Sequence, residues 1–199
     1  MIELPDGLRL VLASASPRRS ELLRSVGLEF DIVPADIDES THSDEAPAAY
    51  VARLSAEKAR VVADLLDTAA IVVAADTTVD VDGQILEKPV DDADARRMLR
   101  LLSGRTHLVH TGVSIAWSPE PRSPGTTTRV VETAVRFVEL TDAAIEWYLA
   151  TGECAGKAGA YGIQGAAGAF VERIDGSVTN VIGLPLAETL ALIRSTSTN

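Results

Sequence analysis

The sequence predicts an α/β fold: a mixed, twisted sheet flanked by helices, in a single domain that spans residues 1–199. Apolar runs of strand length alternate with helix patterns in the first half of the chain. Two long strand patterns follow in the middle, separated by a turn-rich connection that is typical of an antiparallel pair. No shift in composition marks off a second independent domain.

The first expected element is a buried strand over residues 8–12, followed by a hydroxyl-rich turn. Ser16 is placed to cap a helix that begins at Pro17, since proline suits the first helical position. Backbone N–H groups at a helix N-terminus favour an anion, and Arg18 and Arg19 add positive charge there. The junction therefore predicts a phosphate-binding turn; the alternative is a capped surface helix with solvated arginines.

An amphipathic helix is expected over residues 45–67. Its charged residues include Lys58, and a single lysine on a helix face is normally solvated. The apolar positions assigned to the buried stripe are Val51, Leu54, Val61, Val62 and Leu65, and the polar positions are Arg53, Glu57, Lys58 and Arg60.

A continuous apolar run over residues 69–75 predicts a central strand that is buried on both faces. Asp76 follows at the expected carboxyl end of this strand, where ligands bind in open α/β sheets. A helix cap is a weak explanation for Asp76, because another strand pattern follows it. Asp76 is therefore a candidate functional carboxylate.

The remaining elements complete an alternating pattern of strands and helices. They are a hairpin over 78–86 with a type I′ turn at Asp82-Gly83, a helix that Asp91 or Asp92 caps and that runs to Gly104 as its C′ residue, strands over 106–117 and 129–139 joined by an exposed, mobile loop over 118–128, and helices over 141–150 and 184–194.

Glycine recurs at every third position over residues 156–168. The run is short and contains no proline, which excludes a collagen helix. A flexible loop is one reading. Because closely spaced glycines let the backbone approach a ligand, we expect instead a loop that lines a pocket.

Composition narrows the range of partners. The net charge is −11, from 18 Lys and Arg against 29 Asp and Glu, so long nucleic acid is not an expected partner. No run reaches membrane-spanning length, and no signal peptide is visible. Cys154 is the single cysteine, which fits a reducing compartment such as the cytoplasm. His107 and His110 fall on opposite strand faces, so no structural zinc site is expected.

Motif blocks that follow one another along almost the whole chain carry a family resemblance. They are ASASPRRSELL over 13–23, Asp38-Glu39-Ser40, Ala56-Glu57-Lys58-Ala59, Ala74-Ala75-Asp76-Thr77, Gly83 through Lys88-Pro89, Ser103-Gly104 with His107, Thr111-Gly112-Val113, AGAYGIQG over 158–165 and NVIGLPL over 180–186. In this order they resemble the Maf family of nucleoside triphosphate pyrophosphatases, which is related in fold to the inosine triphosphate pyrophosphatases.

The resemblance implies two lobes around a central cleft, in which a nucleoside triphosphate is hydrolysed between its α- and β-phosphates. It places Asp76 as the general base, and Glu39 and Asp76 as ligands of a divalent cation, Mg²⁺ or Mn²⁺. A triphosphate carries about four negative charges, so a metal and a basic clamp suit this chemistry. The implied phosphate-binding residues are Ser14, Arg18, Arg19, Lys58 and Lys88.

Within the family, Arg18, Thr77 and Gln164 match the branch that resembles dTTP/UTP pyrophosphatases. Gln164 offers both a donor and an acceptor, which suits the imide edge of uracil or thymine. Family members often have Asp at the position of Gly156, and Glu153 is a candidate to replace it. The related fold often dimerises, so a homodimer is an open expectation. Two alternatives remain: a pyrophosphatase for modified nucleotides, or a nucleotide-binding regulator of septum formation and cell division with little turnover.

Overall fold

A computed structural model of the chain describes residues 8–118 and 125–196. Its strands are β1 (Arg9–Leu12), β2 (Asp31–Ile32), β3 (Ala70–Val81), β4 (Gln84–Leu86), β5 (Thr106–Ser118), β6 (Thr126–Phe137) and β7 (Val171–Asp175). Its α-helices are α1 (Pro17–Ser25), α2 (Pro47–Asp64), α3 (Asp92–Leu102), α4 (Asp142–Leu149), α5 (Val178–Ile182) and α6 (Leu186–Thr196), and two 3₁₀ turns cover Ala158–Ala160 and Ala166–Phe170.

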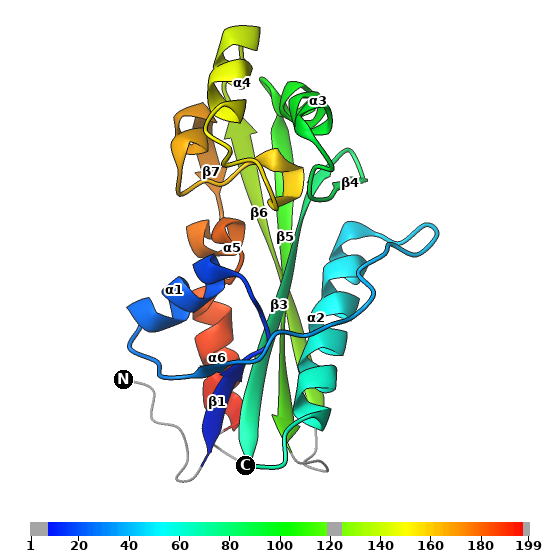
Figure 1. Cartoon of the computed structure of the whole chain (residues 1–199), viewed down its shortest axis with the longest axis vertical. Coiled ribbons are helices and arrows are strands. Elements are labelled where there is room, and N and C mark those ends of the chain that lie inside the picture. Colours follow the sequence, from blue (N-terminus) through cyan, green and yellow to red (C-terminus); the bar gives the residue numbers. More distant parts are fainter. Residues whose placement is uncertain (1–7, 119–124, 197–199) are drawn as a thin grey trace.

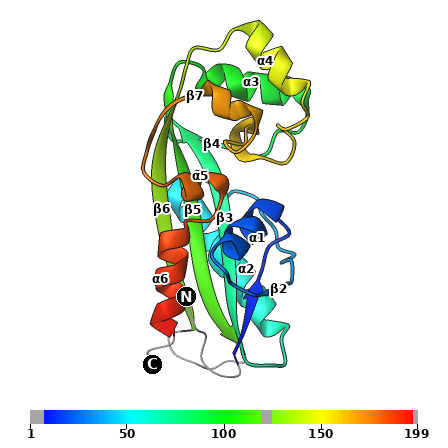
Figure 2. The same cartoon turned by 90° about the vertical axis from the view of Figure 1, so that its left-hand side faces the viewer.

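The strands form one mixed sheet in the order β2-β1-β3-β5-β6-β7, with β4 paired to β3 (Figure 1). β1 runs parallel to β2 and β3, whereas β3, β5, β6 and β7 pair antiparallel in sequence. The predicted α/β class with a mixed sheet is confirmed. The long strands β3, β5 and β6 run through two lobes, one with α1, α2 and α6 and the other with α3 and α4 (Figures 1 and 2).

Side chains alternate between the two faces of β3, and this alternation positions the lobes. On one face, Ile71, Val73 and Ala75 pack with α1 and α6, and Val79 and Val81 pack with α3 and α4. Thr77 interrupts this apolar series where the two clusters meet. On the other face, Ala70, Val72 and Ala74 pack against α2, and the polar residues Asp76, Thr78 and Asp80 follow.

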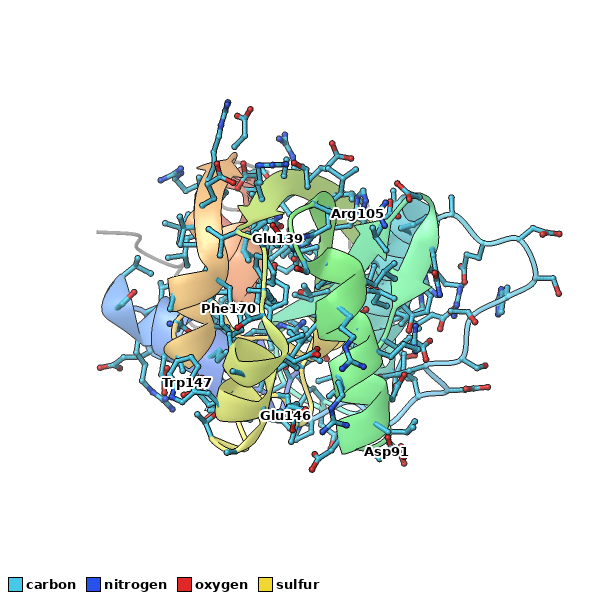
Figure 3. The ribbon with its side chains drawn as sticks, turned by 90° about the horizontal axis from the view of Figure 1, so that it is seen from above. Asp91, Arg105, Glu139, Glu146, Trp147 and Phe170 are labelled. Atoms are coloured by element: carbon cyan, nitrogen blue, oxygen red, sulfur yellow. The ribbon has the colours of Figure 1, made fainter. Side chains whose placement is uncertain are left out.

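In the second lobe α3 and α4 lie side by side (Figure 3). Asp91 caps α3 by accepting from the N–H of Asp94, and Thr141 caps α4. Arg96 of α3 and Glu146 of α4 form an ion pair of 2.5 Å across the two helices. The Asp91 cap follows the sequence prediction, as does Gly104 with its φ of 65° just after α3; the Thr141 cap was not predicted.

The hairpin prediction is also confirmed. Val81 of β3 pairs with Gln84 of β4, and both turn residues have positive φ, 55° at Asp82 and 82° at Gly83. A type I′ turn requires this backbone conformation at both central positions.

Three predictions about elements were wrong in part, and one helix was not predicted. Ser16 stands at the N-cap of α1 but makes no side-chain capping bond. The strand pattern over 69–75 does not end there, because β5 pairs with β3 from Ala70 through Asp80 and keeps it extended past Asp76. Helix α5 was missed. The expected loop over 118–128 is shorter, since Ser118 and Thr126 belong to strands; residues 119–124 lie outside the described part.

The buried stripe of α2 also differs from the expected one. Val61 and Leu65 are 37% and 66% exposed, whereas Lys58 is only 7% exposed. Val51, Lys58 and Val62 share the side of the helix that faces the sheet, at spacings of seven and four residues. Lys58, which the helix pattern alone assigned to the polar face, therefore points into the protein. No helix of the described ranges has the length and apolar character needed to cross a membrane.

We expect the buried His107 to make the free energy of unfolding depend on pH in mild acid. His107 is 1% exposed, Nε2 lies 2.8 Å from the Tyr161 hydroxyl, and burial lowers its pKa to about 4. Between pH 6.5 and about 4 the unfolded chain binds a proton that the folded protein does not, so the free energy of unfolding falls as the pH falls, by up to about 3 kcal/mol.

Thermal denaturation between pH 4 and 7 measures this dependence. We expect His107→Gln to flatten the profile between pH 4.5 and 6.5, and His42→Gln, at an exposed histidine, to leave it unchanged. An equally steep profile in His107→Gln would contradict the assignment.

Candidate active site

All residues that the sequence analysis assigned to the site line a single cavity of about 320 Å³. They come from β1–α1, the segment before α2, α2 itself, β3, the segment after β4, and the glycine-rich loop. They are Ser14, Arg18, Arg19, Glu39, Lys58, Asp76, Thr77, Lys88 and Gln164. The cavity lies between the two lobes, where the apolar clusters of β3 meet.

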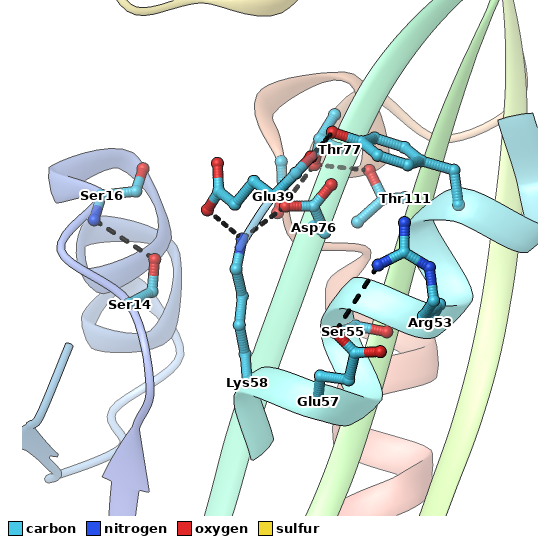
Figure 4. Close-up of polar contacts among 12 residues, drawn as sticks. Ser14, Ser16, Glu39, Arg53, Ser55, Glu57, Lys58, Asp76, Thr77 and Thr111 are labelled. Atoms are coloured by element: carbon cyan, nitrogen blue, oxygen red, sulfur yellow. Dashed lines mark hydrogen bonds and ion pairs between the residues drawn. The ribbon is translucent and has the colours of Figure 1, made fainter. Parts of the chain in front are cut away.

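Lys58 joins the two acidic residues of the cavity (Figure 4). Its Nζ lies 2.6 Å from Asp76 Oδ1 and 2.6 Å from Glu39 Oε1. Glu39 Oε2 accepts from Lys88 Nζ at 3.0 Å. Four segments of the chain thus form a series of alternating charges that ends at Asp76.

The charge of Glu39 is stabilised by these lysines. Burial raises the pKa of its carboxyl, but the hydrogen bonds from Lys58 and Lys88 outweigh burial and lower the pKa to about 2. Glu39 therefore stays ionised throughout the neutral range. It is available as an oxygen ligand or as a partner of the lysines.

Arg19 lies on the other face of β3 and is held by neutral acceptors. Its Nε donates to Gly183 O at 2.8 Å, Nη1 to Ser14 Oγ at 3.1 Å and Nη2 to Thr77 Oγ1 at 3.2 Å. Thr77 Oγ1 is also 2.9 Å from Thr111 Oγ1. Burial lowers the pKa of Arg19, and Asp76 partly offsets this effect. A guanidinium with no carboxylate partner is suited to an anionic ligand.

Ser14 Oγ accepts twice, once from Arg19 and once from Ser16 N–H at 3.2 Å. With both lone pairs engaged, its hydroxyl hydrogen is left to donate to a ligand.

Asp76 and Thr77 reach one cavity although they point to opposite faces of β3. β1 ends at Leu12, opposite Val73, and β4 pairs with β3 only from Val79. In the described part of the chain, no strand pairs with this edge of β3 between the two. The cavity extends around this open edge, which brings Lys58 from one face and Arg19 from the other to the same space.

The glycine-rich loop lines the cavity, as its sequence predicted. Gly159 has a φ of 65°, and a Cβ there would lie 2.8 Å from Val79 Cγ2, so glycine allows the loop to approach β3 closely. Gln164 lines the cavity from this loop. Lys157 also lines it and was missed; a lysine beside a pocket-forming glycine run was the available signal.

The carboxylate of Glu153 does not replace the acid that is absent at Gly156. Glu153 Oε2 accepts from Ala166 N–H at 2.9 Å, and Glu153 is not among the residues that line the cavity. This expectation was wrong because the loop uses the carboxylate to hold its own backbone. Gly156 itself lines the cavity, with a φ of 68°.

Comparisons with known proteins agree with this arrangement. A dTTP/UTP pyrophosphatase of Anaeromyxobacter sp. (strain Fw109-5) is 54% identical over 94% of this chain and 88% of that protein. Proteins of the same name from Shewanella oneidensis and Myxococcus xanthus are each 50% identical, over 94% and 95% of this chain and 97% and 93% of their own lengths.

Among solved structures, the Ham1 protein of Staphylococcus aureus matches with a TM-score of 0.46 and 14% identity, over 65% of this chain and 71% of that one. A likeness of that size carries no argument about this protein. The family match does: residues 9–196 match the family described as Maf-like protein. This chain therefore belongs to the Maf family.

Proposed function

We propose that this protein hydrolyses dTTP and UTP between the α- and β-phosphates, releasing the nucleoside monophosphate and pyrophosphate. The observation that carries the proposal is the single cavity in which five cations, two carboxylates, Ser14, Thr77 and Gln164 converge. Relatives at 50–54% identity that are named dTTP/UTP pyrophosphatases support it.

The cations bind the triphosphate. Lys58 and Lys88 are paired with carboxylates in the protein alone, whereas Arg18 and Arg19 form no ion pair among the described residues. The arginines and the Ser14 hydroxyl donate to the phosphate oxygens first, because no ion pair within the described part of the chain competes for the arginines. Lys58 contacts Asp76 directly and Lys88 is linked to Lys58 through Glu39, and the two lysines neutralise the charge that develops during bond cleavage.

Asp76 acts as the general base. It is 8% exposed, and its Oδ1 is held by Lys58 at 2.6 Å. No hydrogen bond among the described residues engages Oδ2, which is therefore free to accept a proton from the attacking water. The hydrogen bond from Lys58 to Oδ1 fixes the orientation of the Asp76 carboxylate, which leaves Oδ2 as the oxygen that can accept the proton.

Glu39 and Asp76 would hold the divalent cation, Mg²⁺ or Mn²⁺. Both carboxylates meet at one ammonium, Lys58 Nζ, so they already converge on a shared positive charge. No group of three or more His, Cys, Asp or Glu suited to a metal occurs among the described residues. This donor set fits Mg²⁺, which is commonly bound by one or two carboxylates and the substrate phosphates. When bound, the metal neutralises phosphate charge and polarises the reacting groups.

Arg18, Thr77 and Gln164 select the nucleotide. Gln164 presents an amide with both donors and an acceptor to the cavity, matching the carbonyl and N–H groups of a pyrimidine imide. The Thr77 hydroxyl is oriented by Arg19 and Thr111.

We also propose that residues 1–199 act as one domain, because β3 and β5 run through both lobes of the cleft. The cytoplasm is the proposed compartment, in keeping with the unpaired, buried Cys154. A homodimer stays a prediction.

A pyrophosphate-release assay with Mg²⁺ tests the function. The panel contains dTTP, UTP, dCTP, dATP, dGTP and 7-methyl-GTP. We expect kcat/KM to be highest for dTTP and UTP, with equal amounts of monophosphate and pyrophosphate. Release of single phosphate, or a preference for 7-methyl-GTP, would refute the proposal.

Gln164→Glu tests the assignment of specificity. We expect kcat/KM for dTTP and UTP to fall at least about tenfold, since the carboxylate loses the N–H donors and places a negative charge beside the base. Gln84→Glu, at an exposed glutamine of β4, is the matched control. Unchanged dTTP kinetics in Gln164→Glu would remove this residue from base recognition.

A further inference from the structure

Three of the five cations in the cavity have no carboxylate partner. Lys58 and Lys88 are paired with Glu39 and Asp76, but no ion pair among the described residues involves Arg18, Arg19 or Lys157. In a chain of net charge −11, three cations without an ion pair on one cavity form a local positive site that suits an anionic ligand. Arg18 and Arg19 were expected to bind phosphate, whereas Lys157 has no assigned role.

The glycine-rich loop holds the side chain of Lys157 in a defined position. Its Nζ donates to the backbone oxygen of Glu153, and its stem crosses Gly162. A Cβ at Gly162 would lie 2.7 Å from Lys157 Cε and 2.8 Å from Cδ. The N–H of Gly162 donates to the Tyr148 hydroxyl at 3.2 Å, which helps to fix the backbone at this position. Glycine at 162 therefore provides the space in which the lysine lies.

The position of Lys157 suits a phosphate more than solvent. Lys157 lines the cavity together with Arg18, and the positive charge of Arg18 repels that of Lys157. Burial lowers the pKa of Lys157, and repulsion by Arg18 lowers it further. Two cations that repel each other across a cavity are both stabilised when an anion binds between them.

We propose that Lys157 is a substrate-binding residue that acts with Arg18 to hold the phosphates of the nucleotide, and that Gly162 serves to keep its side chain in that place. This inference rests on the proposed function in taking a nucleoside triphosphate as the ligand. The cavity then has two groups of cations. Lys58 and Lys88 form ion pairs with carboxylates, whereas Arg18, Arg19 and Lys157 form none among the described residues.

Inorganic pyrophosphate is the probe, because it carries phosphate groups but no base or sugar. Its dissociation constant is measured by calorimetry on the full chain without metal, for wild type, Lys157→Met, Gly162→Ala and the double variant. Arg60→Met, which removes one exposed positive charge of α2 outside the cavity, is the matched control. Thermal denaturation checks that each variant is folded.

We expect Lys157→Met to weaken pyrophosphate binding at least about tenfold, the effect of losing one charge-assisted hydrogen bond. Gly162→Ala should weaken it in the same direction, because the new Cβ displaces the lysine. In the Lys157→Met background, Gly162→Ala should add less than about twofold, since the two changes act through one side chain. Arg60→Met should change binding by less than about twofold.

Wild-type binding in Lys157→Met, or no pyrophosphate binding by the wild type, would overturn the inference. Weaker binding of a non-hydrolysable dTTP analogue with unchanged pyrophosphate binding would also overturn it, and would move Lys157 to the base. These outcomes are separate from the proposed function. A wild type that binds pyrophosphate through Lys157 but does not hydrolyse dTTP would refute the function alone.

Discussion

Asp76→Asn is expected to lower kcat for dTTP by about 10²–10⁴, the range for removal of a general base. Asparagine keeps the shape of the side chain but cannot accept the proton of water. Binding of a non-hydrolysable dTTP analogue should persist, because Ser14, Arg18 and Arg19, which we propose bind phosphate, do not contact Asp76 through any hydrogen bond of the described structure. Steady-state pyrophosphate release and calorimetry measure the two effects.

Asp64→Asn, at an exposed carboxylate at the end of α2, is the control and should retain full activity. Loss of hydrolysis with retained binding in Asp76→Asn would support an enzyme over a nucleotide-binding regulator of septum formation. Hydrolysis that is unaffected by Asp76→Asn would show that another group prepares the water.

Gly112→Ala is expected to lower the free energy of unfolding by about 3 kcal/mol or more, because a methyl group would be forced into a backbone contact. A Cβ at Gly112 would lie 2.2 Å from the Val51 carbonyl oxygen and 2.8 Å from Ser55 Oγ. α2 packs directly on β5 at this point. For a chain of this size, the change corresponds to a fall in Tm of about 6–12 °C.

The same substitution should lower activity in any folded fraction, since α2 carries Lys58 to Asp76. Denaturant unfolding measures the stability, and Ser55→Ala with Gly112→Ala is the informative double variant. Removing the Ser55 hydroxyl relieves only the side-chain contact, so the double variant should remain destabilised. Recovery of wild-type stability would mean that the Val51 backbone is not the obstacle.

Local signals in the sequence predicted most elements of the fold. The Asp82-Gly83 turn, the Asp91 cap and Gly104 after α3 were predicted because each depends on neighbouring residues alone. The errors share a different cause. The strand at Asp76 was ended too early because its extension depends on pairing with β5, a segment about 35 residues away in the chain.

The site residues divide in the same way. Ser14, Arg18 and Arg19 belong to one strand–turn–helix junction, so the sequence indicated a phosphate site directly. Lys58 occupies a polar position of an amphipathic helix pattern, where a lysine is normally solvated. The family resemblance was what assigned it to the site. Lys157 was missed because its direction depends on the space above Gly162.

By itself, the sequence determined the α/β class and the residue types that line the cavity, and it indicated a phosphate-binding turn, because these follow from spacing and side-chain chemistry. Only the tertiary structure decided which cations are paired and which are open to a ligand. β1 stops at Leu12 and leaves an edge of β3 uncovered, so Asp76 and Thr77 share a cavity from opposite faces. Charge compensation depends on distances between segments that the chain brings together only when it folds.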